Sequence, residues 1–258
     1  MSSATRFGKA ATLCLSLAAS TAALAQEKGE GPATLVLSYR AKPEHRAAFR
    51  EHMEGAGIAQ FEKWKKDKVF ADYQVLFSSY VNEATWDMLA VLSFDRYVDQ
   101  ARWKEIERKM PGGLTPQALA WAAPVTTYVA DLTWSGKAPT RDSARAAYLV
   151  IPYAYSARAE YKPYAEGYVI PQMKGWLAEG VLSSYSIYLN QNEAGEPWDA
   201  MFILEYRDIQ GLALRRMTTN KVRAALAVSD AEWKRLSDTK QDVRKEGQVV
   251  FADAILAR

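Results

Sequence analysis

The sequence predicts an α+β protein built from two copies of one unit, and three observations support this. Hydrophobic residues make up 49% and charged residues 24% of the 258 residues, which is typical of a globular chain. Aromatic residues recur 112 positions apart, as Trp86 and Trp198 do. Strand-like alternation and helix-like spacing also follow one another in the same order in each half. We therefore expect two equivalent units in a single chain.

The duplication is clearest in the least common residue types. Three tryptophan pairs and one tyrosine pair share the same spacing of 112: Trp64 and Trp176, Trp86 and Trp198, Trp121 and Trp233, Tyr73 and Tyr185. The dipeptides Glu54-Gly55 and Glu166-Gly167 obey it too. Such agreement in rare residues is not expected by chance.

Each copy reads as a strand, a helix, a two-stranded hairpin, a second helix and a closing strand. In the first copy, residues 35–39 alternate as a strand and residues 43–66 place apolar side chains on one helical stripe. The remaining elements are expected at residues 69–80, 86–94, 97–110 and 126–132, with a short helical stretch ending at Trp121. The second copy repeats the strands near residues 148–155, 182–190, 198–206 and 248–256. This β-α-β-β-α-β order is that of a ferredoxin-like unit.

We expect the first unit at residues 33–133, a linker at 134–145 that contains Gly136 and Pro139, and the second unit at 146–258. Helices cover one face of the sheet in such a unit and leave the other face bare. Two bare faces in one chain bury each other. The fold class is therefore α+β, with two tandem ferredoxin-like units packed sheet to sheet as an intramolecular α+β barrel.

The N-terminus, residues 1–25, has the features of a secretory signal peptide. Arg6 and Lys9 precede an apolar run, and Ala23-Leu24-Ala25 forms a small-x-small cleavage site. The apolar run is about 15 residues long, short of the roughly 20 that span a membrane. We expect cleavage before Gln26, no stable membrane insertion afterwards, and a periplasmic or secreted protein. The mature chain then lacks cysteine, because Cys14 is removed, which excludes thiolate chemistry.

Charge and motifs exclude further classes. Without Arg6 and Lys9, the 33 basic residues fall to 31 against 30 acidic ones, which argues against nucleic acid as a partner. The two histidines, His45 and His52, are seven residues apart, too far along a helix to share a metal ion. No glycine-rich phosphate loop, HExxH or GxSxG motif is present. We expect no metal and no cofactor.

Glu54 and Glu166 are the candidate catalytic residues. Each lies next to a glycine in the middle of a predicted helix, where glycine costs about 1 kcal/mol relative to alanine. We therefore expect this helix to be bent or interrupted there. An interruption can turn the carboxylate toward a cavity, where desolvation raises its pKa for proton transfer. The alternative is that the glycine permits close packing and the glutamate points to water.

Six paired aromatic residues are the candidate ligand-binding residues. Large rings at these positions suit a pocket for a planar or apolar ligand, and they equally suit a packing cluster. The residues are Trp64, Tyr73, Trp86, Trp176, Tyr185 and Trp198. Since successive strand residues face opposite sides, Asp87 and Asp199 should point away from Trp86 and Trp198 and cap a turn or an edge.

The element order and the duplication resemble those of the dimeric α+β barrel superfamily. That group holds antibiotic-biosynthesis monooxygenases, the NIPSNAP and EthD families, muconolactone isomerases and haem proteins of the chlorite dismutase type. The resemblance covers nearly all of the mature chain and implies a small-molecule site between the helices and one face of each sheet. It also implies a proximal histidine in the second half for the haem branch. The second copy has no histidine, so haem is not expected unless a tyrosine replaces it as the ligand.

Two functions of different classes follow, and the sequence leaves open whether the protein is an enzyme. The first is a small-molecule-binding or accessory protein with aromatic-lined clefts for an apolar or aromatic molecule. The alternative is a cofactor-independent monooxygenase or isomerase acting on an aromatic or polyketide-like substrate, with Glu54 or Glu166 as the base. A role in assembly with other envelope proteins, or as a homo-oligomer, is also open because the fold does not determine function.

Overall fold

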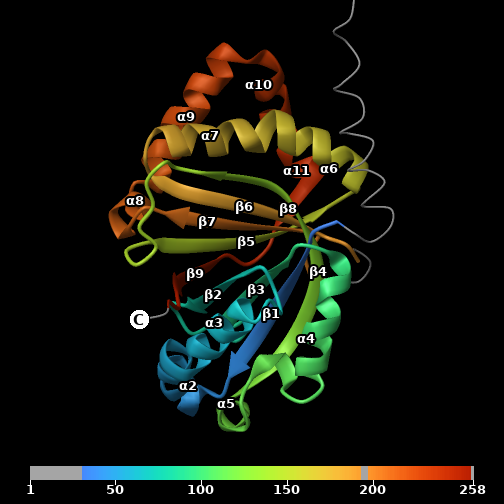
Figure 1. Cartoon of the computed structure of the whole chain (residues 1–258). Helices are drawn as coiled ribbons and strands as arrows, with labels where there is room; N and C mark the ends of the chain where they lie inside the picture. Colours follow the sequence, from blue (N-terminus) through green and yellow to red (C-terminus); the bar gives the residue numbers. More distant parts are fainter. Residues whose placement is uncertain (1–30, 193–196, 257–258) are drawn as a thin grey trace, which may run out of the picture.

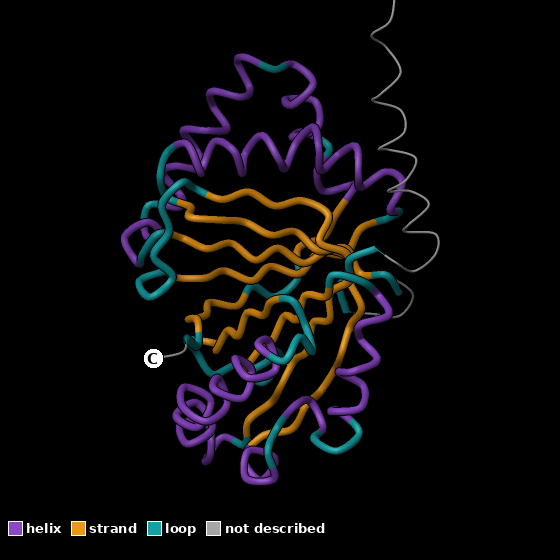
Figure 2. Tube along the Cα trace, viewed as in Figure 1, coloured by secondary structure: helices purple, strands orange, loops and turns teal. Residues whose placement is uncertain are grey.

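The computed structural model describes residues 31–192 and 197–256, so the predicted signal peptide lies outside the described residues. Within them, antiparallel strands form one large sheet in the middle of the molecule and helices cover its outer side (Figures 1 and 2). The predicted α+β class, with a large antiparallel sheet, is confirmed. No helix among these residues has the length and apolar character needed to cross a membrane.

Each strand and helix that the sequence predicted is present, with ends shifted by a few residues. The first half contains β1 (Ala33–Ala41), η1 (Pro43–His45), α2 (Arg46–His52), η2 (Met53–Gly57), α3 (Ile58–Lys66), β2 (Asp72–Ser78), β3 (Met88–Phe94), η3 (Tyr97–Asp99), α4 (Gln100–Glu107), η4 (Pro111–Gly113), α5 (Pro116–Trp121) and β4 (Ala122–Lys137). The second half contains β5 (Ala147–Tyr155), α6 (Arg158–Tyr164), η5 (Ala165–Val169), α7 (Ile170–Ala178), β6 (Leu182–Asn190), β7 (Ala200–Tyr206), α8 (Ile209–Ala213), α9 (Arg215–Ser229), α10 (Ala231–Asp238), α11 (Lys240–Val243), β8 (Arg244–Glu246) and β9 (Val250–Ala254).

The nine strands form one continuous sheet that closes on itself. Their order is β7-β6-β4-β1-β3-β2-β9-β5-β8, and β7 also pairs with β5. The strands from β7 round to β5 therefore make a barrel, and β8 lies outside it against the end of β5. Within each half the order is the same, β4-β1-β3-β2 and β9-β5-β7-β6.

The two halves join through shared strands, and here the structure differs from two separate sheets stacked face to face. β4 runs through 16 residues, well beyond the predicted end at Leu132. Its first part pairs with β1 and its last part, residues 130–137, pairs with β6 of the other half. β9 likewise pairs with both β5 and β2. Pairing at these positions leaves no exposed barrel edge, which is why residues expected in a linker are drawn into a strand.

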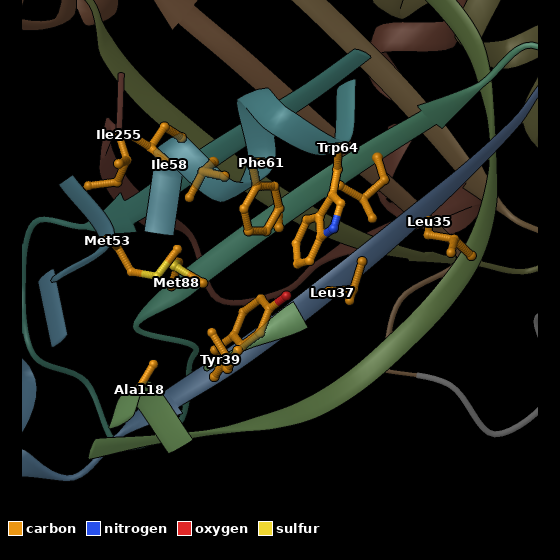
Figure 3. Close-up of a cluster of buried hydrophobic side chains, with 14 of the residues drawn as sticks. Leu35, Leu37, Tyr39, Met53, Ile58, Phe61, Trp64, Met88, Ala118 and Ile255 are labelled. Atoms are coloured by element: carbon orange, nitrogen blue, oxygen red, sulfur yellow. The ribbon is translucent and has the colours of Figure 1, made fainter. Parts of the chain in front are cut away.

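The buried side chains fall into three layers. One cluster fills the space between the first-half helices and the sheet, and Figure 3 shows part of it, with Phe61 and Trp64 over Leu35 and Leu37. A second cluster lies between the sheet and the second-half helices, which form the top layer of Figure 1. The third is the interior of the barrel, where residues such as Leu76 and Tyr188 from both halves meet.

Both long helices are interrupted at the predicted place. Residues Met53–Gly57 and Ala165–Val169 form single π-helical turns between α-helical segments. Glu54 and Glu166 are the second residues of these turns. Glycine lowers the local preference for α-helix, so one extra residue is accommodated in each helix.

Asp87 and Asp199 cap strand ends. The carboxylate of Asp87 accepts hydrogen bonds from the backbone N–H of Ala41 at 2.9 Å and from Nε of Arg46 at 2.7 Å. Asp199 accepts from the backbone N–H of Tyr155 at 2.9 Å. Each aspartate thus fixes the end of β1 or β5 next to the helix that follows.

We predict that Asp87→Ala lowers the free energy of unfolding by about 3 kcal/mol, because it leaves the largely buried Arg46 without its ion-pair partner and a buried N–H without an acceptor. Urea-induced unfolding measures this. Asp238→Ala is the control, since its ion pair with Lys234 is exposed and should leave the unfolding midpoint nearly unchanged. If both substitutions lower the free energy of unfolding equally, Asp87 does not stabilise the fold in the way described.

Many tyrosine hydroxyls are buried, and burial favours the neutral phenol. Burial raises the pKa of Tyr188 and of Tyr206 to about 12. Burial also raises the pKa of Tyr161 and of Tyr164, both in the second-half cluster. In the unfolded chain such phenols ionise near pH 10.

We predict that the fold keeps its full stability below about pH 10 and loses it as the pH rises through 12, because only the unfolded chain gains by ionising these phenols. Parallel titrations of phenolate absorbance and circular dichroism should show the buried phenols ionising together with unfolding. Tyr188→Phe removes one of these groups and should move the transition to higher pH. If all phenols ionise near pH 10 while circular dichroism still shows a folded chain, the prediction is wrong.

Candidate functional site

The barrel has a cavity at each of its two mouths. We call them the tryptophan mouth, about 320 Å³, lined among others by Trp86, Tyr128, Trp198 and Met201, and the tyrosine mouth, about 670 Å³, lined among others by Tyr73, Tyr148, Tyr185 and Tyr188. Both volumes fall within the range of small-molecule sites. Each mouth draws residues from both halves of the chain.

The alternation of strand residues explains this division. Along β4, Tyr128 lines the tryptophan mouth, Leu132 lines the tyrosine mouth, and Ala130 lies between them in the barrel core. Along β9, Ala252 lies in the same way between Val250 and Ala254. Every second residue points inward, so one strand serves both cavities.

Trp86 and Trp198 both line the tryptophan mouth. Each directly precedes an aspartate that caps a strand end on the other side of the sheet, so each indole points into the barrel. Trp198 is 6% exposed, and its ring packs edge-on against Tyr128 with 5.3 Å between centroids. The cavity wall at this mouth is therefore largely aromatic.

A few polar groups converge on the tryptophan mouth. The hydroxyl of Thr85 is buried and has no hydrogen-bond partner among the described residues. The hydroxyls of Ser38 and Thr126 bond to each other at 2.6 Å, and Arg40 donates to the carbonyl of Asn82 at 3.2 Å. An apolar wall with one unsatisfied hydroxyl can hold an aromatic ligand and fix its orientation.

Tyr73 and Tyr185 both border the tyrosine mouth, although each packs in the helix–sheet cluster of its own half. Burial raises the pKa of both phenols, and the hydroxyl of Tyr73 donates to Oε1 of Glu62 at 2.6 Å. Gly136 in β4 lies against the Tyr185 ring, where an added Cβ would stand 2.5 Å from the nearest ring atom. The close approach of β4 to Tyr185 therefore requires glycine at this position.

A buried ion pair at the tyrosine mouth was missed from the sequence. The Glu205 side chain is 1% exposed, and both its oxygens accept from Nε of Arg141 at 2.6 Å. The hydroxyl of Ser184 donates to Glu205 at 2.8 Å. The hydrogen bond to Glu205 raises the pKa of Arg141, so this guanidinium stays charged. The available signal was an acid at the end of the apolar run Met201–Leu204.

Trp64 and Trp176 lie elsewhere, in the two helix–sheet clusters, and line neither mouth. Each is 6% exposed. The Trp64 ring packs edge-on against Trp103 with 5.6 Å between centroids, within the cluster of Figure 3. Their position corresponds to the packing alternative that the sequence left open.

Glu54 and Glu166 lie on the outer surface of their helices. Glu54 accepts from Nε of Arg50 at 2.9 Å, and Glu166 is exposed. Neither lines one of the two mouths. Their catalytic role stays a prediction.

The two histidines do not form a metal site with each other. His52 lies 3.4 Å from the hydroxyl of Thr115 and packs edge-on against Trp121. Across residues 31–192 and 197–256, no three histidine, cysteine, aspartate or glutamate side chains gather as metal ligands would.

The comparisons with known proteins bear on the fold. No protein-family model matches the sequence, and no curated protein matches it. An anthrone oxidase-like protein is 11% identical over 89% of this chain and 93% of its own, with a TM-score of 0.56. A candidate monooxygenase from Lactobacillus acidophilus NCFM is 14% identical over 88% and 95%, with a TM-score of 0.50. A mutant chlorite dismutase from Candidatus Nitrospira defluvii, in complex with cyanide, is 9% identical over 90% and 93%, with a TM-score of 0.51. At these identities the likeness establishes the fold alone, an α+β barrel of the ferredoxin-like type.

Proposed function

We propose that this protein binds a small apolar or aromatic molecule at the tryptophan mouth of its barrel. The observation that carries the proposal is the meeting of Trp86 and Trp198, 112 residues apart in the sequence, across one cavity of about 320 Å³. A cavity of this size suits a ligand of one or two rings. The unpaired hydroxyl of Thr85 supplies a polar contact for it.

The packing elsewhere supports this choice of site. The resemblance to the superfamily placed the ligand between helices and sheet, but large side chains fill both of those layers. In the second half, for example, Tyr168 and Trp233 are 0% and 2% exposed and stack with 5.1 Å between centroids. The second half also contains no histidine that could bind a haem iron.

The proposal also covers how the chain arose and in which cellular compartment it lies. We propose a fused tandem of two ferredoxin-like units, at residues 33–133 and 146–258, of the NIPSNAP, EthD or antibiotic-biosynthesis-monooxygenase type. The matching strand orders and the π-helical turns 112 residues apart support the duplication. Secretion to the periplasm remains part of the proposal and rests on the sequence of residues 1–25.

We predict that Trp86→Ala weakens binding of the neutral fluorescent probe N-phenyl-1-naphthylamine roughly tenfold, since an aromatic contact contributes about 1.4 kcal/mol. Probe fluorescence in a titration measures the affinity. Trp121→Ala is the matched control, because this indole packs against His52 outside both mouths and its loss should not affect the probe. Circular dichroism verifies that both variants fold. If the wild-type chain does not bind the probe, or if both variants lose affinity for it equally, the proposal is refuted.

The second candidate function is cofactor-independent oxygenation or isomerisation of an aromatic or polyketide-like substrate. The paired π-helical turns that carry Glu54 and Glu166 favour it, because such turns are frequent at functional sites. The monooxygenase and oxidase names among the structural neighbours agree with it. Binding remains the first choice, since neither carboxylate lines a barrel mouth.

For this second function, we predict that Glu54→Gln with Glu166→Gln abolishes dioxygen uptake with an anthrone as the test substrate and leaves probe binding intact, because glutamine cannot act as the base. An oxygen electrode measures the rate. Glu51→Gln, an exposed neighbour on the same helix, is the control. If the wild-type chain shows no uptake, or the double variant retains it, these glutamates are not catalytic in this reaction.

A further inference from the structure

A third cavity lies in the second half of the chain, lined by none of the residues of the two barrel mouths. Its volume is about 570 Å³, and residues of β5, α9, α11 and β8 line it. These residues are Tyr153, Arg223, Lys240, Gln241, Arg244, Lys245 and Glu246. Four of the seven carry a positive charge and one a negative charge, so the cavity attracts anions.

Arg244 lies at the centre of the argument, because its guanidinium is held among aromatic rings. Its Cζ lies 4.1 Å from the ring centroid of Tyr153 and 5.6 Å from those of Tyr164 and Phe202. Its Nη1 is buried and has no hydrogen-bond partner among the described residues. Burying a charged donor without an acceptor is costly, and an arginine in such a place is normally paired with an acid. The guanidinium interacts with the uncharged Tyr161 hydroxyl, and among the described residues it forms no ion pair with a carboxylate, so its positive charge is left for an anion in the cavity to neutralise.

The other cations of this cavity are not neutralised either. Arg223 donates from Nε to the side-chain oxygen of Gln172 at 2.8 Å, and Lys240 donates to the carbonyl of Ser237 at 2.8 Å. Both acceptors are uncharged. The one acid, Glu246, accepts from the hydroxyl of Tyr153 at 3.1 Å.

Other basic residues of the second half, unlike those of the third cavity, form ion pairs with acids. Lys221 pairs with Glu179 at 2.6 Å, and Arg235 pairs with Glu232 at 2.6 Å. Among the residues that the structure describes, none of the four cations lining the third cavity takes part in an ion pair of this kind.

This cavity exists in one half only. In the first half, β4 begins at Ala122, directly after α5 ends. In the second half, residues 239–249 stand between α10 and β9, and they form α11 and β8 with Lys240, Arg244 and Lys245. The cationic cluster is therefore an addition to the second half and has no counterpart in the first.

We propose that the third cavity binds an oxyanion, the carboxylate or phosphate group of a small molecule, through the guanidinium of Arg244. The two outer nitrogens of a guanidinium match two oxygens of such a group. Arg223 and Lys240 stand at the same cavity and add attraction for the negative charge. The site is independent of the tryptophan mouth and shares no lining residue with it.

The test is isothermal titration calorimetry of the full mature chain at low salt, with inorganic phosphate and with benzoate as two separate probes. We expect at least one probe to bind with a stoichiometry of one. Phosphate binding alone assigns a phosphate ester as the ligand class, and benzoate binding alone assigns a carboxylate. Arg244→Gln should weaken binding roughly tenfold, as expected for a charge-assisted hydrogen bond. Lys240→Gln, at a half-buried position, should weaken it several-fold, and circular dichroism verifies that both variants fold.

Two controls separate this site from other effects. Arg235→Gln removes a cation of the same half that is already paired with Glu232, and it should leave anion binding unchanged. Trp86→Ala should also leave anion binding unchanged. This control separates the test of the third cavity from the test of ligand binding at the tryptophan mouth. Failure of the wild-type chain to bind either probe would overturn the proposal. Unaltered binding in both Arg244→Gln and Lys240→Gln would overturn it as well.

Discussion

Closure of the sheet by β4 and β9 is the constraint on which the rest of the structure depends. A sheet covered by helices on one side leaves an apolar face and unpaired edges on the other. β4 is long enough to pair first with β1 and then with β6, and β9 joins β5 to β2 in the same way. The edges disappear and the bare faces enclose a core made by both halves. Each mouth of the barrel is consequently bordered by both halves of the chain, which is why residues far apart in sequence meet there.

The same closure explains which sequence patterns could be interpreted and which could not. Strands and helices followed from local periodicity, and the interrupted helices followed from glycines beside Glu54 and Glu166. The end of β4 did not, because Gly136 and its polar neighbours resemble a linker when taken alone. Gly136 is small because Tyr185 of the other half packs against it. That requirement arises from a contact between distant segments, and no local pattern encodes such a contact.

The six aromatic candidates show how much of a site can be predicted from residue pairs spaced 112 positions apart. The spacing of 112 identified equivalent residues, but equivalence does not say on which side of the sheet a ring lies. Trp64 and Trp176 end helices and pack under them, whereas Trp86 and Trp198 face the barrel because the following aspartates cap strand ends on the other side. A pair that faces the barrel necessarily converges at one mouth. A pair under the helices stays apart, one member in each half.

A charged residue is harder to repeat at both equivalent positions of such a mouth than an aromatic residue is. Glu205 is bonded to Arg141 and Ser184, which line the tyrosine mouth, and the residue 112 positions earlier is Ser93, which also lines that cavity. A glutamate at both positions would place two carboxylates at one mouth, and like charges so close together disfavour ionisation of both. With serine at position 93, Arg141 from the segment between β4 and β5 suffices to pair the single carboxylate. At this shared cavity, aromatic residues such as Tyr73 and Tyr185 can therefore remain matched while the charged residue at position 205 differs from its counterpart.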